Sequence, residues 1–420
     1  MELKRVVVTG LGAVTPLGNS PEETWENMLK GVSGAANITQ FDTSKFKTHF
    51  ACEIKDLDIN EYLNPKESRK IDRYTQLALI SAIQGVKDSG IDLETIDKSR
   101  VGVIYGVGIG GIRTFEDEVT YYGQHIENGP RFSPFFIPKM IADIASGHIS
   151  IHFGFNGPNY TTTSACASSS HALADAFNLI RLGKADVILA GGAESAICAC
   201  GVGGFNSMKA LSTRNDEPEK ASRPFSASRD GFVMAEGSGC LILEEYEHAK
   251  ARGAKIYAEM VGEGESADAY HITASHPEGL GAKLVMKAAI EDAGIKPEDI
   301  DYINVHGTST HVGDISEVKA IKEVFGDAAY KLNISSTKSM TGHLLGSAGA
   351  IEAMVCVFAV KNDIVPPTIN HEEGDDDPEI DYNLNFTFNK AQKREVQYAL
   401  SNTFGFGGHN ACVVFKKYVE

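Results

Sequence analysis

The 420-residue sequence has little of several features that mark particular classes of protein. It holds one Trp and 7 Cys, and the cysteines are scattered along the chain without a CxxC pair. A disulfide framework is therefore not expected. Basic residues are in deficit, with 39 Lys and Arg against 56 Asp and Glu, which gives a net charge of −17. Because phosphate contacts need clustered Lys and Arg, we expect no nucleic-acid partner.

Long hydrophobic runs are also missing. We find no stretch near the roughly 18 to 20 apolar residues of a membrane helix. Residues 1–5 lead straight into a β-branched run at Val6, without the apolar region of a signal peptide. We therefore expect a cytoplasmic protein with no membrane partner. With 42% hydrophobic residues, the chain can still bury a large core.

Short β-branched runs alternate with helical patterns, and this alternation predicts an α/β fold. The two halves of the chain share this layout, which suggests an internal duplication fused into one body. The predicted strands are residues 5–9, 101–105, 186–190, 256–261, 301–305 and 395–400, and glycine-rich turns are expected at 10–12, 106–111, 191–192 and 405–408.

Two other patterns suggest ligand sites that we disfavour. Gly10-Leu11-Gly12 after the first strand is a weak match to a dinucleotide loop, because Pro16 interrupts the helix start and no suitable acidic residue follows. Cys198-Ala-Cys200 has no nearby His, so two small packed residues are a better interpretation than a zinc site.

A cysteine surrounded by small residues carries more information. In residues 161–176 extended chain is expected to turn into a helix at Cys166, which is the layout of a nucleophile elbow. The positive end of the helix dipole would lower the pKa of the thiol and favour the reactive thiolate. Inert packing is the alternative for a cysteine taken alone.

Two histidines could complete such a site. His306 follows the strand 302–305, where α/β proteins place ligands, and His343 follows a glycine turn. Lys338 precedes His343, and Glu352 lies nine residues beyond it. A cysteine and two histidines in such turns together predict an activated thiol.

A basic stretch at residues 64–73 is the exception on this acidic chain. Asn64 can cap a helix with Pro65 in its first position. The residues that then recur on one helical face are Lys66, Arg69, Lys70 and Arg73. This face could dock an acidic partner, or it could be an ordinary solvated surface.

Together these motifs carry a resemblance that spans nearly the whole chain. The Ala165-Cys166 elbow, His306-Gly307-Thr308-Ser309-Thr310, residues 338–343 and Phe404-Gly405-Phe406-Gly407-Gly408 resemble the β-ketoacyl-acyl carrier protein synthases of the thiolase superfamily. The likeness is closest to the synthase II type of bacterial fatty acid synthesis.

The resemblance implies a duplicated, five-layered α-β-α-β-α fold. It places the nucleophile in an N-terminal half, 1–252, and the catalytic histidines in a C-terminal half, 253–420. It implies a homodimer that buries part of each active site, and no cofactor.

The implied reaction is a decarboxylating Claisen condensation of a malonyl carrier protein with an acyl-enzyme thioester, with no catalytic metal. Cys166 takes an acyl group from an acyl carrier protein, and a malonyl carrier protein then enters, which gives ping-pong kinetics. Decarboxylation produces a carbanion that is stabilised through His306 and His343. The products are 3-oxoacyl carrier protein, longer by two carbons, carbon dioxide and free carrier protein.

Further roles also come from the resemblance alone. Lys338 and Glu352 organise the charge of the site, and the backbone N–H groups of Cys166 and Phe406 form the oxyanion hole. The remaining assignments are Phe404 as the gate of the acyl pocket, Thr308 and Thr310 on the pantetheine arm, Ile109 in the acyl tunnel, and Lys66, Arg69 and Lys70 on the carrier protein. A structural monovalent cation is implied near Asn304, Glu352, Ser401 and Asn402.

The sequence departs from the family pattern at two loop positions, and other readings stay open. His311 and His409 stand where many relatives carry Pro and Thr, and we interpret both as tolerated variation. A thiolase would need a second reactive cysteine near the turn 404–409, and Cys412 lies beyond it. An inactive partner subunit is disfavoured by the intact Cys166, whereas a polyketide ketosynthase subunit remains open.

Overall fold

A computed structural model describes residues 3–419, which are built around one ten-stranded mixed sheet. Its strand order is β10-β9-β13-β14-β8-β1-β7-β6-β4-β5. The strands are β1 (Val6–Val14), β4 (Val101–Gly106), β5 (Asn159–Thr162), β6 (Val187–Glu194), β7 (Gly237–Glu245), β8 (Ala258–Ala267), β9 (Tyr302–Asn304), β10 (Asn333–Ser335), β13 (Tyr398–Gly405) and β14 (His409–Lys417). Two further pairs lie outside this sheet, β2 (Ala36–Asn37) with β3 (Phe50–Ala51), and β11 (Ile364–Val365) with β12 (Gln392–Lys393).

The strand order repeats about the centre of the sheet. The run β1-β7-β6-β4-β5 has two antiparallel pairings followed by two parallel ones. The run β8-β14-β13-β9-β10 has the same sequence of pairings, and the two runs meet where β1 pairs with β8. The predicted duplicated α/β architecture is therefore confirmed. The predicted division after residue 252 falls between α9 (Tyr246–Ala251) and β8.

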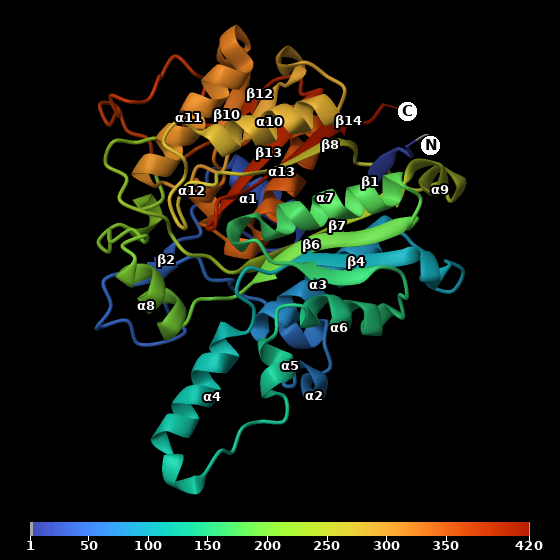
Figure 1. The fold of residues 1–420 in the computed structure, drawn as a ribbon, viewed down its shortest axis with the longest axis vertical. Helices are drawn as coiled ribbons and strands as arrows, with labels where there is room; N and C mark the ends of the chain where they lie inside the picture. Colours follow the sequence, from blue (N-terminus) through green and yellow to red (C-terminus); the bar gives the residue numbers. More distant parts are fainter. Residues whose placement is uncertain (1–2, 420) are drawn as a thin grey trace.

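Helices form three layers around these strands (Figure 1). One outer layer, α3 and α6, packs on the first run of strands, and the other, α10 with α11, packs on the second. Between the two runs lie α7 and α13, which contact each other and both sets of strands. The longer helices are α1 (Pro21–Leu29), α3 (Arg73–Ser89), α4 (Ile112–Gln124), α6 (Ile144–Phe153), α7 (Ser168–Arg181), α8 (Ala199–Ser207), α10 (Leu280–Asp292), α11 (His311–Phe325) and α13 (Ala348–Asn362), and the short ones are α2 (Pro65–Ser68), α5 (Phe136–Met140) and α12 (Lys338–Thr341).

The helix α13 corrects the expectation about hydrophobic runs. The stretch Leu345–Asn362 is long and apolar enough to cross a membrane, by length and composition alone, and 89% of it is buried inside the protein. A helix that is apolar on every side fits the centre of a large core. Its place between the two runs of strands explains its composition.

The first glycines form no turn, which corrects another expectation. β1 continues through Gly10 and Gly12 to Val14. A Cβ on Gly12 would lie 1.9 Å from the carbonyl oxygen of Ser81 in α3, so glycine is required here because strand and helix backbones touch. The predicted turn at 191–192 likewise lies inside β6. The weak dinucleotide loop is therefore a piece of buried strand.

The basic stretch forms two helices rather than one. Asn64 caps α2 as predicted, with its side chain accepting a hydrogen bond from the backbone N–H of Lys66. The helix ends at Ser68, and Asp72 caps the separate helix α3. The guanidinium of Arg73 then forms a two-point ion pair with the buried Glu236, at 2.7 and 2.8 Å. The expectation that Arg73 shares the free basic face is wrong.

Candidate active site

A sharp turn carries Cys166 at the junction of β5 and α7. Ala165 takes a left-handed backbone conformation, with φ at 52°, and a 3-10 turn over Ala165–Ala167 leads into the helix. The predicted elbow is therefore present. Gly405, the last residue of β13, lies against it, and a Cβ there would be 2.5 Å from the carbonyl oxygen of Ser164. The absence of a side chain at Gly405 lets the strand end reach the elbow.

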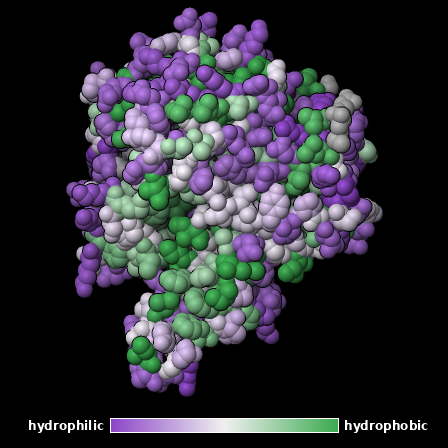
Figure 2. Space-filling model, in the orientation of Figure 1, coloured by the Kyte–Doolittle hydropathy of each residue, from purple (hydrophilic) through white to green (hydrophobic). Residues whose placement is uncertain are grey.

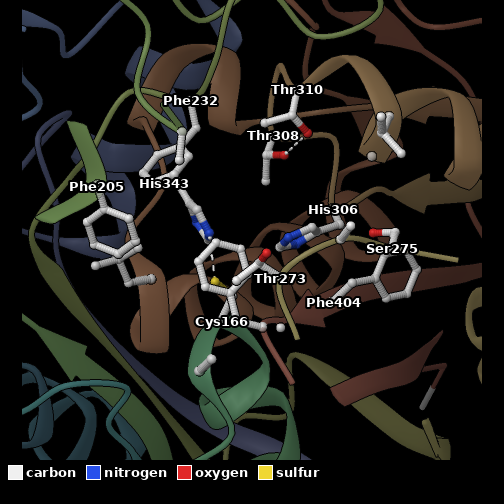
Figure 3. Close-up of a pocket in the computed structure, with 18 of the residues that line it drawn as sticks. Cys166, Phe205, Phe232, Thr273, Ser275, His306, Thr308, Thr310, His343 and Phe404 are labelled. Carbon is white, nitrogen blue, oxygen red and sulfur yellow. Dashed lines mark hydrogen bonds between the residues drawn. The ribbon is translucent and has the colours of Figure 1, made fainter. Parts of the chain in front are cut away.

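The elbow opens into a cavity of about 580 Å³. Figure 3 shows Cys166, His306 and His343 turned toward one another in it, with Phe404 beside them. The predicted residues that line the cavity are Cys166, His306, His343, Thr308, Thr310, Ile109, Phe404 and Phe406. Residues far apart in the sequence are thus brought to one place by the strand ends.

The thiol of Cys166 has two direct neighbours. Nε2 of His343 lies 3.0 Å from Sγ, and the backbone N–H of Phe406 is near enough to favour negative charge on the sulfur. Burial raises the pKa of the Cys166 thiol to about 12, although Lys338 and the Phe406 N–H act in the opposite direction. The expected lowering of this pKa is therefore wrong, because loss of hydration outweighs the favourable charges. Burial at Cys166 thus favours the thiol over the thiolate, with His343 Nε2 within hydrogen-bonding distance of Sγ.

Both histidines are held neutral. Burial, with the nearby charge of Lys338, lowers the pKa of His306 and the pKa of His343 well below the usual value. Their rings meet edge to face, with centroids 5.3 Å apart. A neutral imidazole has one N–H donor and one free acceptor nitrogen. The pair can therefore accept a proton and donate a hydrogen bond in the same cavity.

An ion pair lies behind the histidines. Lys338 and Glu352 are both buried, and Nζ donates to a carboxylate oxygen of Glu352. Burial raises the pKa of the Glu352 carboxyl to about 7, against the pull of Lys338. Neither residue lines the cavity, so their influence on the thiol and imidazoles is exerted through charge.

Several acidic residues near the site were missed by the sequence analysis, and two of them lie on α11. The carboxylate of Glu317 accepts the backbone N–H groups of His306 at 2.9 Å and Gly307 at 2.8 Å, and burial raises its pKa to about 7. Asp314, one helical turn earlier, is buried against Arg229. A signal existed, because these carboxylates share a helical face with buried apolar residues such as Ile321.

Four oxygens near this ion pair have no hydrogen-bond partner among residues 3–419, although all are buried. Ser401 and Asn304 face each other on the neighbouring strands β13 and β9. Unpaired buried oxygens of this kind commonly mark a bound ion or water. These four oxygens therefore fit the monovalent cation that the resemblance implies. The atoms are Asn304 Oδ1, Glu352 Oε2, Ser401 Oγ and Asn402 Oδ1.

The mouth of the cavity is polar. The hydroxyls of Thr308 and Thr310 are 3.0 Å apart, and His311 at the start of α11 also lines the opening. Nε2 of His311 lies 3.5 Å from Asp377, whose carboxylate is already paired with the buried Arg229 at 2.8 Å. His409 is exposed at the start of β14 and is not among the lining residues.

The predicted docking residues form a separate surface. Lys66 and Arg69 are exposed, and Lys70 pairs with Glu67 at 2.7 Å. Nζ of Lys139, on α5, lies 3.4 Å from the carbonyl oxygen of Arg69 and adds a further positive charge to this side. None of these residues lines the cavity.

The fold and the arrangement around Cys166 define a thiolase-like condensing enzyme. A scan against protein families matches "Beta-ketoacyl synthase, N-terminal domain" over residues 3–249 and "Beta-ketoacyl synthase, C-terminal domain" over residues 257–372. The chain belongs to the β-ketoacyl synthase family.

Relatives of this chain make the resemblance more specific. It is 50% identical over 416 residues to 3-oxoacyl-[acyl-carrier-protein] synthase 2 of Staphylococcus aureus (strain COL), with 99% of each chain covered. It is 49% identical over 419 residues to the protein of the same name from Synechocystis sp., covering 100% of this chain and 99% of that one. The predicted likeness to the synthase II type is confirmed.

Solved structures agree with the fold. A β-ketoacyl synthase from Burkholderia phymatum superposes with a TM-score of 0.91 at 35% identity, covering 99% of this chain and 100% of that one. A type II PKS acyl-carrier protein in complex with its ketosynthase, bound to the hexaketide, gives a TM-score of 0.91 at 33% identity with the same coverage. The predicted thiolase-like fold is confirmed.

Proposed function

We propose that this protein joins an acyl group and a malonyl group, both delivered on acyl carrier proteins, by a decarboxylating Claisen condensation in fatty acid elongation. The observation that carries the proposal is the contact of 3.0 Å between His343 Nε2 and Cys166 Sγ, with His306 in the same cavity. The names of the relatives support the same substrate class.

The first half-reaction acylates Cys166. As Sγ forms a bond to the thioester carbonyl carbon, the thiol proton moves to His343, and the C–S bond to the pantetheine then breaks. The leaving pantetheine thiolate then takes this proton from His343. The negative carbonyl oxygen is met by the backbone N–H groups of Cys166 and Phe406, the donors of the proposed oxyanion hole.

The second half-reaction uses the malonyl carrier protein. The bond between the carboxylate carbon and the methylene carbon breaks, carbon dioxide leaves, and its electron pair passes to the thioester as an enolate. His306 and His343 stabilise the enolate oxygen in the tautomers that present an N–H to it. The carbanion attacks the acyl-Cys166 carbonyl carbon, the C–S bond to Cys166 breaks, and the 3-oxoacyl carrier protein leaves. The Cys166 thiolate takes up one proton from solvent, which restores the thiol. Kinetics are ping-pong because the first carrier protein leaves before the second enters.

Charged residues behind the imidazoles support both steps. The charge of Lys338 disfavours protonated imidazoles, so it keeps their N–H and lone-pair positions available. Glu317 holds the backbone at His306. A monovalent cation held by the four unpaired oxygens around Asn304 would supply a fixed positive charge near Glu352 and Glu317.

The substrates are placed by the mouth and the outer surface. Thr308 and Thr310 bond the pantetheine arm, Ile109 lines the acyl tunnel, and Phe404 gates it, its ring 5.6 Å from that of His306. The acidic acyl carrier protein docks on Lys66, Arg69 and Lys70, an exposed positive surface on a chain of net charge −17.

The protein acts as a homodimer. Within each chain, the N-terminal half, 1–252, and the C-terminal half, 253–420, each supply part of the site. α4 and α5 form an arm that projects from the body, and Figure 2 shows hydrophobic side chains gathered along it. Ile126 is 63% exposed and Ile137 is 55% exposed on this arm, and β5 is the last strand of the sheet. An exposed apolar patch is typical of a subunit interface, and an edge strand offers unpaired backbone groups to a second copy. We assign the enzyme to the cytoplasm.

A polyketide ketosynthase subunit is the second candidate. It is favoured by the likeness in fold to the type II PKS ketosynthase, at 33% identity. The 50% identity to a 3-oxoacyl-[acyl-carrier-protein] synthase 2 favours fatty acid elongation instead.

Mass spectrometry of the intact protein tests the proposal. The wild type, mixed with a long-chain acyl carrier protein, gains one acyl mass, and added malonyl carrier protein discharges it as 3-oxoacyl product and carbon dioxide. Cys166→Ala gains no mass, whereas Cys200→Ala, which changes an exposed cysteine, behaves as wild type. An adduct on Cys166→Ala, or none on the wild type, overturns the assignment.

A further inference from the structure

Glu194 places a buried carboxylate between two loops of the site. It is the last residue of β6 and has no exposed surface. Its oxygens accept backbone N–H groups from three successive residues of the loop after β4, namely Gly108 at 2.9 Å, Ile109 at 3.2 Å and Gly110 at 3.2 Å. The oxygen that meets Gly108 also accepts the N–H of Gly346 at 3.1 Å.

The two loops carry different parts of the proposed machinery. The loop after β4 holds Ile109, which lines the cavity, and Gly346 lies three residues after His343. Their backbones approach so closely that a Cβ on Gly346 would be 2.2 Å from the backbone nitrogen of Gly108. A side chain on either glycine would push the two loops apart. Both backbones can therefore reach the Glu194 carboxylate only when Gly108 and Gly346 lack side chains.

The turn that bears Gly346 is built like the turn that bears Cys166. Leu345 has φ at 50° where Ala165 has 52°, and each begins a 3-10 turn that leads into a central helix. In the second turn the N–H of Gly346 is occupied by Glu194. Burial raises the pKa of the Glu194 carboxyl to about 7, against the effect of its N–H donors.

We infer that Glu194 is a positioning residue that fixes the acyl-tunnel loop at Ile109 to the turn after His343. The inference rests on the proposed function, because it assigns Ile109 to the acyl tunnel and His343 to the reaction. The inference goes beyond the proposed function because it assigns one residue, Glu194, to hold both the loop at Ile109 and the turn after His343. Long acyl chains, which must pass Ile109, therefore depend on Glu194 more than short ones do.

Glu194→Gln tests this coupling with little change in shape. The amide of glutamine has an NH₂ group in place of one carboxylate oxygen. This NH₂ group faces backbone N–H groups, which are also donors, so the hydrogen bonds to that oxygen are lost. We expect the acylation rate with a sixteen-carbon acyl carrier protein to fall about 30-fold, and with a four-carbon one about threefold or less, since small misplacements in a site have large kinetic costs.

A matched control separates this role from general stability. Glu53 is another buried carboxylate that accepts backbone N–H groups, from Thr39 and Gln40, and it is not among the cavity residues. Glu53→Gln should leave the ratio of long-chain to short-chain rates at the wild-type value. Melting temperatures of both variants show whether either has lost its fold.

A double-mutant cycle provides the second readout. If Glu194 acts through the loop at Ile109, the losses of Glu194→Gln and Ile109→Ala on the long-chain rate are not additive. Equal losses for long and short chains, or additive losses in the cycle, overturn the inference. A wild type that forms no acyl-enzyme at all instead defeats the proposed function, which keeps the two failures distinct.

Discussion

Cys166 and Gly346 occupy equivalent turns in the two halves of the sheet. Each follows a residue in the left-handed conformation and precedes a helix of the central layer. At the first turn the side chain is a thiol that faces the cavity, and at the second there is no side chain and the N–H is bonded to Glu194. The duplication thus has one turn that bears the proposed nucleophile and one turn that joins two loops.

The two histidines should differ in the acylation step, which we assign to His343, whereas carbon dioxide release should depend on both. His343 contacts Sγ of Cys166 at 3.0 Å, so His343→Ala should slow acylation by about 10²-fold or more. His306→Ala should leave acylation closer to wild type and slow carbon dioxide release from malonyl carrier protein, because we assign His306 to the enolate. Single-turnover acylation and carbon dioxide release measure the two steps. The reverse pattern would exchange the proposed roles.

Gly405 should be sensitive to a single methyl group. A Cβ there would lie 2.5 Å from the carbonyl oxygen of Ser164 and 3.2 Å from the backbone nitrogen of Cys166. Gly405→Ala therefore pushes the end of β13 off the elbow and should reduce the acylation rate about 10²-fold. Gly204→Ala is the control, because a Cβ at this exposed helical position meets nothing within 4 Å. Equal rates for the two variants would contradict the prediction.

The buried carboxyl of Glu317 should make stability depend on pH. Burial raises its pKa to about 7 in the folded protein, whereas an unfolded Glu has a pKa of about 4.3. Between these values the folded state holds a proton that the unfolded state releases, so the contribution of Glu317 to stability falls as the pH rises through this window.

Glu317→Gln does not titrate and isolates this effect. The melting temperature of the variant minus that of the wild type should increase as the pH is raised from about 5 to about 8. The lost acceptor for the His306 or Gly307 N–H adds a constant penalty at every pH. Differential scanning calorimetry at several pH values checks this, and a difference independent of pH would show that the carboxyl does not titrate in that range.

Much of the fold followed from the sequence because the signals are local. Alternating runs of β-branched residues and helices predict an α/β fold, and Asn64-Pro65 predicts the start of α2. The extent of β1 could not be predicted in this way. Gly10 and Gly12 indicate a turn locally, and only the approach of α3 to the strand explains glycine there. The same holds for residues 191–192 in β6.

The candidate site was predicted in part for a related reason. Cys166, His306 and His343 stand in recognisable turns, so their roles could be proposed before their distances were known. Glu194 and Glu317 act on backbone N–H groups of other segments, and no short motif marks such contacts. The pKa of Cys166 was predicted in the wrong direction, because helix position is visible in the sequence and depth of burial is not.

Removing one partner of the buried Lys338–Glu352 ion pair should lower the stability of the protein. Lys338 and Glu352 are each at most 3% exposed. Lys338→Met leaves the carboxylate without its partner, so the free energy of unfolding should fall by about 3 to 5 kcal/mol. In Lys338→Met/Glu352→Gln no charge remains, and part of this loss should be recovered. Urea unfolding of Lys338→Met, Glu352→Gln and the double variant measures the difference, and a double variant as unstable as the sum of the two single changes would argue against a direct pair.

Charge reversal tests the proposed docking surface without changing a residue that lines the cavity. Lys66→Glu, Arg69→Glu and Lys70→Glu together should raise the KM for acyl carrier protein about tenfold or more, because each exposed charge contributes modestly and reversal adds repulsion. The effect should shrink as salt is added. Acylation by a small acyl-pantetheine thioester, which has no carrier protein, should keep its wild-type rate.

The same charge change elsewhere controls for net charge. Lys390→Glu alters an exposed lysine that lies outside this surface, and a variant that also carries Lys393→Glu and Lys416→Glu matches the total change of charge. We expect its KM for acyl carrier protein to stay within about threefold of wild type, because charges separated by more than a Debye length, about 8 Å at physiological salt, are largely screened. A similar rise in KM for both triple variants would mean that the carrier protein responds to overall charge, and Lys66, Arg69 and Lys70 would lose their assignment.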